Sequence, residues 1–178
     1  MNRGSGIACT LLTGMLIHAS AAAPPTEEYR VKGAFLLNFT SFVQWPAQAF
    51  RGPGDAIAIC VLGTNPFTPE LDLAARRVVA DKRAVTVRQI PDAQHARGCQ
   101  IVFVSVSERK HAHALIQALQ GQSVLTVGES EGFVASGGVI EFRVEENRVR
   151  MEIGTEAAKR ARLNISSKLL SLVQAARK

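Results

Sequence analysis

The chain has 178 residues, a formal net charge of +6 and an aromatic content of only 6%. This length suits one domain with a real hydrophobic core, and no repeat or low-complexity segment indicates a second one. The lysines and arginines are scattered and form no basic stripe, which argues against a nucleic-acid-binding protein.

Residues 1–22 have the pattern of a cleaved signal peptide. Arg3 supplies the positive start, residues 7–19 form a short apolar run, and Ala19-Ser20-Ala21 offers the small residues that a signal peptidase recognises. The run is short for a membrane anchor. We therefore expect an exported protein whose mature chain, residues 23–178, forms a single domain.

The mature chain is expected to open with a helix over residues 28–45. Polar residues within this segment rule out a membrane span. Trp45-Pro46 should end the helix, because proline lacks an amide hydrogen and disfavours a helical residue before it. The expected buried face has helical spacing and comprises Val31, Ala34, Phe35, Phe39, Phe42 and Val43.

Strands and helices are expected to alternate after residue 50. Apolar runs predict strands over 56–62, 84–90, 100–106 and 123–127. One intervening helix should begin at Thr68-Pro69, and another should run from a capping box at Ser105 to about Gln120. The alternation predicts a three-layer α/β fold with a mostly parallel sheet flanked by helices.

The last third of the sequence predicts a C-terminal antiparallel hairpin of residues 139–144 and 148–153. A turn at Glu146-Asn147 would keep both apolar rows in phase by pairing Val144 with Val149 and Phe142 with Met151. The other face carries Glu141, Arg143, Arg150 and Glu152. This face is either an ordinary solvated surface or a charged recognition surface.

Beyond the hairpin, two helices capped by Thr155 and Asn164 are expected.

Cys60 and Cys99 are the only cysteines of the mature chain. Two cysteines in an oxidising compartment most often pair, and this bridge would add about 4 kcal/mol in the chain-entropy model. Two buried free thiols are the alternative. A metal site is disfavoured, because no histidine stands at a recognised ligand spacing from either cysteine.

The common nucleotide-binding motifs of enzymes are missing. Neither a Gly-x-Gly-x-x-Gly fingerprint nor a Walker loop is present in the sequence. The three histidines of the mature chain, His95, His111 and His113, are best explained as solvated side chains. We therefore expect a protein that is not an enzyme, with no catalytic residue, no metal and no cofactor.

Two separated blocks of sequence carry a family resemblance. The first runs from Tyr29 to Phe39 and continues through Val43-Gln44-Trp45-Pro46. The second is made of three short pieces near the end of the chain, residues 138–142, 150–153 and 163–170. In both blocks the chain resembles the YfiR family of bacterial periplasmic regulators, and the similarity covers essentially all of the mature sequence.

The resemblance implies a periplasmic inhibitory regulator. Such a protein binds the periplasmic sensor part of an inner-membrane diguanylate cyclase and lowers cyclic di-GMP signalling. Release of the cyclase raises cyclic di-GMP and favours biofilm. It is expected to form a homodimer, and an OmpA-like outer-membrane lipoprotein can capture it. By position, Cys60 and Cys99 would form the family disulfide. The candidate partner-binding residues are Glu141, Arg143, Arg150, Glu152 and Ile153.

The sequence departs from the family pattern at two points. Better-known members have a second cysteine pair in the last third, whereas residues 128–152 contain none, which leaves one bridge. Gly154 stands where relatives often have asparagine.

The alternative function is a periplasmic small-ligand-binding protein without catalysis. Its pocket would lie at the carboxyl ends of the strands, near residues 63–65 and 105–107.

Overall fold

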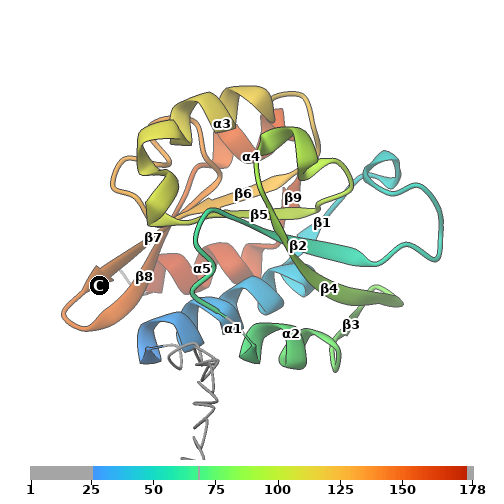
Figure 1. The fold of residues 1–178 in the computed structure, drawn as a ribbon, viewed down its shortest axis with the longest axis horizontal. Helices are drawn as coiled ribbons and strands as arrows, with labels where there is room; N and C mark the ends of the chain where they lie inside the picture. Colours follow the sequence, from blue (N-terminus) through green and yellow to red (C-terminus); the bar gives the residue numbers. More distant parts are fainter. Residues whose placement is uncertain (1–25, 68, 176–178) are drawn as a thin grey trace, which may run out of the picture.

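The computed structural model describes residues 26–67 and 69–175, so the expected signal peptide lies outside the described residues. Figure 1 shows the arrangement of the helices and strands. In chain order they are α1 (Glu27–Phe42), β1 (Val43–Gln44), η1 (Ala47–Ala49), β2 (Ile57–Leu62), α2 (Glu70–Ala75), β3 (Val79–Ala80), β4 (Arg83–Ile90), η2 (Ala93–Ala96), β5 (Ile101–Val104), η3 (Val106–His111), α3 (Ala112–Ala118), β6 (Leu125–Gly128), β7 (Ile140–Glu145), β8 (Arg148–Ile153), α4 (Thr155–Arg160), β9 (Asn164–Ile165) and α5 (Ser167–Ala175).

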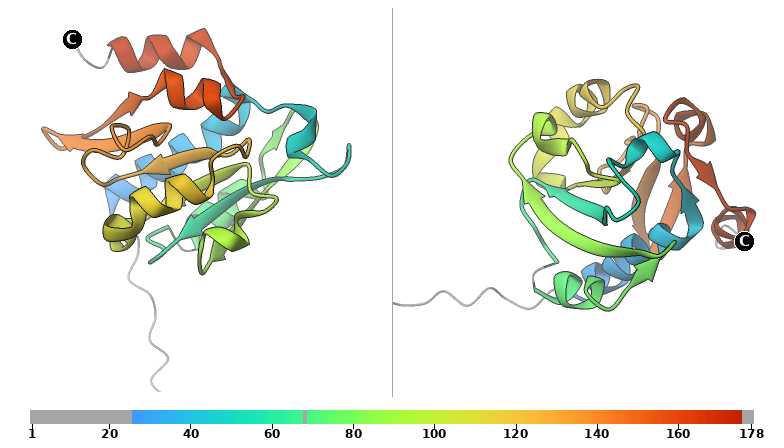
Figure 2. Two further views of the ribbon diagram at one scale, coloured as in Figure 1. Left: turned by 90° about the horizontal axis from the view of Figure 1, so that it is seen from above. Right: turned by 90° about the vertical axis from the view of Figure 1, so that its right-hand side faces the viewer.

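A curled, mostly parallel sheet forms the middle layer, and the right-hand view of Figure 2 shows its curvature. The strand order is β3-β4-β2-β5-β6-β7-β8. The five strands from β4 to β7 are parallel, whereas β3 and β8 run antiparallel to their neighbours at the two edges. The parallel strands follow the order of a doubly wound sheet. The predicted mixture of a parallel sheet and a terminal hairpin is confirmed.

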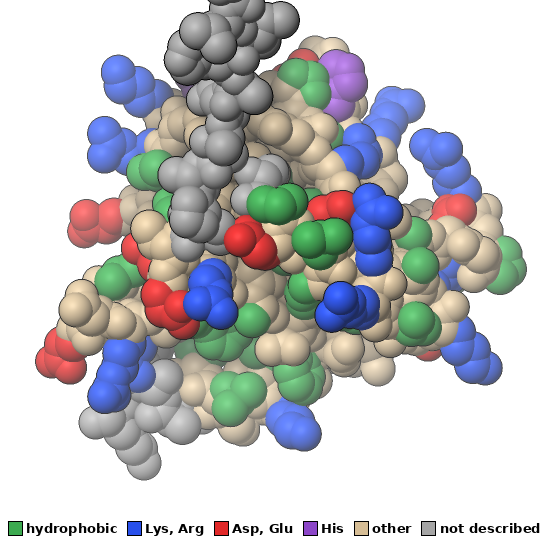
Figure 3. All heavy atoms as spheres, turned by 60° about the horizontal axis from the view of Figure 1, so that its bottom comes forward, with side chains coloured by type: hydrophobic (Ala, Val, Ile, Leu, Met, Phe, Trp, Pro, Cys, Tyr) green, Lys and Arg blue, Asp and Glu red, His purple; other side chains and the backbone are tan. Residues whose placement is uncertain are grey.

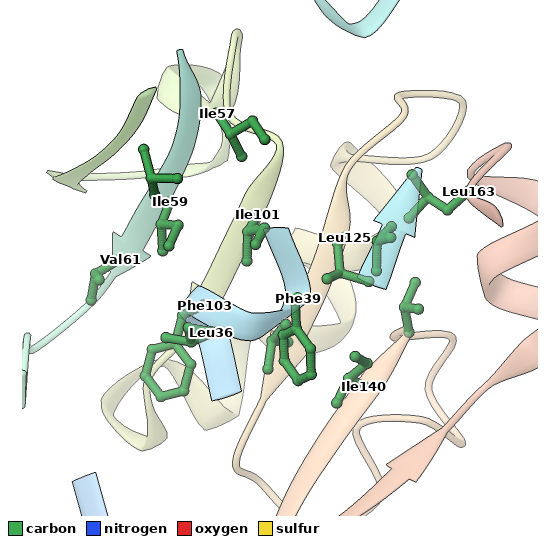
Figure 4. Packing of buried hydrophobic residues seen from close by; sticks show 14 of the residues in the cluster. Leu36, Phe39, Ile57, Ile59, Val61, Ile101, Phe103, Leu125, Ile140 and Leu163 are labelled. Carbon is green, nitrogen blue, oxygen red and sulfur yellow. The ribbon is translucent and has the colours of Figure 1, made fainter. Parts of the chain in front are cut away.

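Strand β2 explains why there are three layers. All of its residues are buried, and successive side chains point to opposite faces of the sheet. Ile57, Ile59 and Val61 belong to the core beneath α1 and α2, as Figure 4 shows in part. Cys60 and Leu62 belong to a second core, which is covered by α3 and η2. A continuous apolar run is therefore required here, and helices flank both faces as predicted.

Helix α1 differs from its prediction in its end and in its buried face. It stops at Phe42, three residues early, because the backbone of Val43 and Gln44 pairs with a strand from the end of the chain. The buried face is rotated from the expected one, since Val31 and Phe35 are half-buried and Ala34 is exposed. The buried residues are Lys32, Gly33, Leu36, Phe39 and Thr40.

Three helix starts were also predicted wrongly. Ser105 precedes η3, not an α-helix, and its side chain makes no capping hydrogen bond. Asn164 lies in β9, and the hydroxyl of Ser166 instead accepts from the backbone amide of Leu169 at 3.3 Å. Thr155 is the first residue of α4, not its cap. Thr68 lies outside the described residues, and α2 begins after Pro69.

Candidate functional site

The hairpin of β7 and β8 forms one edge of the sheet. Glu146 and Asn147 both have positive φ angles, of 50° and 58°, as a two-residue type I′ turn requires. The register pairs Val144 with Val149 and Phe142 with Met151, as predicted. Only the first residues of β7 pair with β6, so the rest of the hairpin extends beyond the parallel sheet, at the left of Figure 1.

One face of the hairpin is organised by Arg143. Its Nε donates to Glu141 Oε1 at 2.8 Å, and its Nη2 forms an ion pair with Glu152 on the neighbouring strand. The hydrogen bond to Glu141 and the nearby carboxylates raise the pKa of Arg143 above its ordinary value. The side chain is 44% exposed and that of Glu152 is 31% exposed. The predicted diagonal pairing of glutamate with arginine is therefore present.

Glu141 is buried, unlike its two charged neighbours on this face. Its carboxylate accepts hydrogen bonds from the backbone amides of Gly132 at 3.3 Å and Val134 at 3.1 Å. These contacts hold the loop that joins β6 to β7, in addition to orienting Arg143. Glu141 thus supports the hairpin from within, whereas Arg143 and Glu152 are partly exposed.

The other two candidate residues have different surroundings. Arg150 stands opposite Arg143 in the register and is half-buried, with its Nε buried and without a hydrogen-bond partner in the described part of the chain. Ile153 lies on the opposite face of β8, where it packs against the core. Phe142, on that same face of the hairpin, lies 6.0 Å from the ring of Phe35 on α1. The hairpin is therefore anchored by its apolar face and presents its charged face outward.

A buried lysine lies near the hairpin, at a position that was not predicted from the sequence. Lys32 is 3% exposed, and its Nζ lies 2.6 Å from Oε2 of the buried Glu129. A second ion pair joins Lys32 to Glu28, one helical turn earlier. The spacing of Glu28 and Lys32 was a visible clue to this pair. Glu129, however, is 97 residues away in the chain.

Tyr29 lies against this cluster, and its ring centroid is 4.8 Å from Lys32 Nζ. Burial, together with the negative charges of Glu129 and Glu28, raises the pKa of Tyr29 to about 12. The phenol is therefore neutral at physiological pH. The Oε1 atom of Glu129 also accepts from the amide of Val106 at 2.9 Å, which ties η3 to α1 through one carboxylate.

Cys60 and Cys99 form a disulfide, with Cα atoms 5.9 Å apart, as expected. Both residues are buried, and the bridge joins the inner strand β2 to the residues just before β5. Arg88 on β4 lies beside it, with Nη2 3.1 Å from the Sγ of Cys99. The same nitrogen donates to the carbonyl of Arg97 at 3.0 Å. The bridge therefore connects two segments of the second core, and Arg88 links it to the loop after β4.

The carboxyl ends of β2 and β5, where the alternative ligand pocket was expected, are occupied by the protein's own side chains. The hydroxyl of Ser107 accepts from the backbone amide of Thr64 at 2.9 Å. Gly63 has a φ of 87°, and a β-carbon at this position would lie 2.4 Å from Ser107 Oγ. The backbone amide that could bind an anion here is therefore already hydrogen-bonded.

Together these features define an α/β domain of doubly wound strand order, with a charged hairpin at one sheet edge. The chain belongs to the YfiR/HmsC-like family, whose model matches residues 29–174. Membership indicates a periplasmic regulator of diguanylate cyclase signalling. A comparison with curated proteins gave no match. Within residues 26–67 and 69–175, no helix is long and apolar enough to span a membrane.

Proposed function

We propose that this protein is an inhibitory regulator that binds the periplasmic sensor part of an inner-membrane diguanylate cyclase. The exposed face of the β7–β8 hairpin would make the contact. The observation that carries this assignment is the position of Arg143 and Glu152, paired and partly exposed on the edge of the sheet. Such a pair is oriented before binding and can exchange its partners for charges on another protein.

The hairpin suits this role because its apolar face is anchored in the core. Met151 and Ile153 pack against the core, and Glu141 holds the preceding loop. β8 is the last strand of the sheet, so its outer edge has no strand partner in the described part of the chain. Partners often bind an edge strand through main-chain hydrogen bonds and select it through side chains.

Inhibition would follow from a population shift of the cyclase. The regulator must bind the inactive sensor conformation more tightly than the active one, and only this difference in affinity lowers activity. A tenfold preference corresponds to about 1.4 kcal/mol. Capture of the regulator by an OmpA-like outer-membrane lipoprotein would release the cyclase, and a homodimer would present two hairpins.

Co-purification and enzyme assays test this function. The mature chain should co-purify with the cyclase's periplasmic domain and lower cyclic di-GMP synthesis by the full-length cyclase in membranes. A folded protein that neither binds the domain nor lowers synthesis would refute the proposal. Sedimentation of the regulator alone and with the soluble part of the lipoprotein tests the homodimer and the capture step separately.

A further inference from the structure

An open hollow of about 600 Å³ lies beside the hairpin, between the start of α1, η3, the loop after β6 and strand β7. On one side it is lined by Lys32 with its neighbours Glu28, Tyr29 and Glu129, and on the other by residues 141–145 of β7. In Figure 3, several acidic side chains gather at the left, the side on which Figure 1 shows the β7–β8 hairpin.

The hollow is acidic, although the chain has a net charge of +6. Five glutamates line it, together with one lysine and one arginine. Both cations are already neutralised, Lys32 by two glutamates and Arg143 by two others. Glu131 and Glu145 are exposed and have no ion-pair partner among residues 26–67 and 69–175. The uncompensated charge of this surface is therefore negative.

The hollow also gathers exposed apolar side chains. Val106 is 50% exposed and Val144 is 49% exposed, and both line it. The half-buried ring of Tyr29 contributes further apolar surface. The backbone of Val106 is held by its hydrogen bond to Glu129, so this part of the surface is positioned before binding. A preformed apolar patch flanked by charges is typical of a protein-binding site.

We propose that this hollow docks a cationic segment of the protein partner. A lysine or arginine of that segment would meet Glu131 and Glu145, and an adjacent apolar side chain would cover Val106 and Val144. Charge complementarity selects such a segment over a neutral or acidic one and speeds its association. The inference rests on the proposed function only for the identity of the partner.

Amide NMR shifts of the mature protein, titrated with two peptides, test the hollow by itself. The peptide Lys-Ile-Lys-Ile-Lys amide should shift the resonances of Val106, Glu131, Val144 and their neighbours, whereas Glu-Ile-Glu-Ile-Glu amide should not. Glu131→Lys or Glu145→Lys should weaken binding of the cationic peptide about tenfold, or about 1.4 kcal/mol. The same change at an exposed residue of α2, Glu70→Lys, should have no effect.

The inference is overturned if the shifts are scattered over the surface, if both peptides cause them, or if the two variants bind as tightly as Glu70→Lys. The cyclase's periplasmic domain then distinguishes the inference from the proposed function. Weaker binding of that domain by Glu131→Lys and Glu145→Lys supports the hollow as its docking site. Undiminished binding by both variants, together with loss in Glu152→Arg, overturns the hollow and leaves the proposed function intact.

Discussion

The side-chain amide of Asn164 donates a hydrogen bond to Gln44 Oε1 at 3.2 Å, across 120 residues of chain. The backbones of these residues are also paired, in the two-stranded sheet of β1 and β9. Gln44 belongs to the first block of family resemblance and Asn164 to the second. The two blocks are therefore one structural unit that joins both ends of the domain, and this explains why they occur together.

The disulfide between Cys60 and Cys99 should contribute about 4 kcal/mol to the free energy of unfolding, because it closes a loop with a sequence separation of 39. Urea unfolding, followed by the fluorescence of the single tryptophan, Trp45, measures this contribution with and without reductant. The double variant Cys60→Ala/Cys99→Ala should be insensitive to reductant. Equal stability of the oxidised and reduced wild-type protein would show that the bridge does not stabilise the fold.

The only tyrosine of the chain, Tyr29, should titrate at about pH 12 in the folded protein and near its ordinary value of 10.0 after unfolding. The folded state resists ionisation of the phenol, so its stabilising effect is complete below pH 10 and is lost as the pH rises toward 12. Ultraviolet absorbance of the phenolate follows this titration directly. In Tyr29→Phe, the part of the alkaline stability loss due to this phenol should disappear.

Folded Tyr29 that titrates near 10 would contradict the buried, negatively charged surroundings that the structure gives it. A wild-type protein that unfolds before pH 12 would still be informative. In that case its unfolding midpoint should lie at a lower pH than that of Tyr29→Phe.

Lys32→Met should destabilise the protein by about 3–5 kcal/mol, because it leaves Glu129 buried without its counter-ion. The double variant Lys32→Met/Glu129→Gln should recover much of this loss. Arg30→Met is the matched control on the same helix, since Arg30 and its partner Glu27 are both largely exposed. Its effect should stay within about 0.5 kcal/mol. Equal urea midpoints for Lys32→Met and Arg30→Met would rule out a stabilising buried pair.

Glu141→Ala should cost about 3 kcal/mol, because it removes the acceptor for two backbone amides and for Arg143. Hydrogen exchange at Gly132 and Val134 should speed up selectively. Glu141→Gln should retain part of the protection, since its amide oxygen still accepts. Glu145→Ala, at an exposed position of the same strand, serves as the control. Unchanged exchange at both amides in Glu141→Ala would show that the carboxylate does not hold the loop.

Local patterns predicted much of the sheet. The apolar run of β2 required burial on both faces. In the hairpin, a two-residue turn at Glu146-Asn147 together with the two apolar rows predicted the observed register. Each pattern depends on side-chain period within a few residues, which the sequence displays directly. The positions of Arg143 and Glu152 as neighbours across the hairpin followed from that register.

Contacts between distant segments could not be predicted in this way. Helix α1 ends at Phe42 because the backbone beyond it pairs with β9, and helical periodicity carries no information about that pairing. Lys32 is buried because Glu129 lies against it. Phe133 fills the space left by Gly128 and Gly138, where a β-carbon would lie within 2.4 Å of its ring. In each case the contact that determines the local structure comes from a residue that is distant in sequence or lies in a loop without a periodic pattern.

Titration calorimetry of the mature protein with the cyclase's periplasmic domain tests the proposed regulator most directly. Glu152→Arg removes the counter-ion of Arg143 and places a second positive charge beside it, so its affinity should fall at least about tenfold. Glu70→Arg should bind as the wild type does, and urea midpoints verify that both variants are folded. A folded Glu152→Arg with wild-type affinity would contradict the assignment of this hairpin as the inhibitory surface.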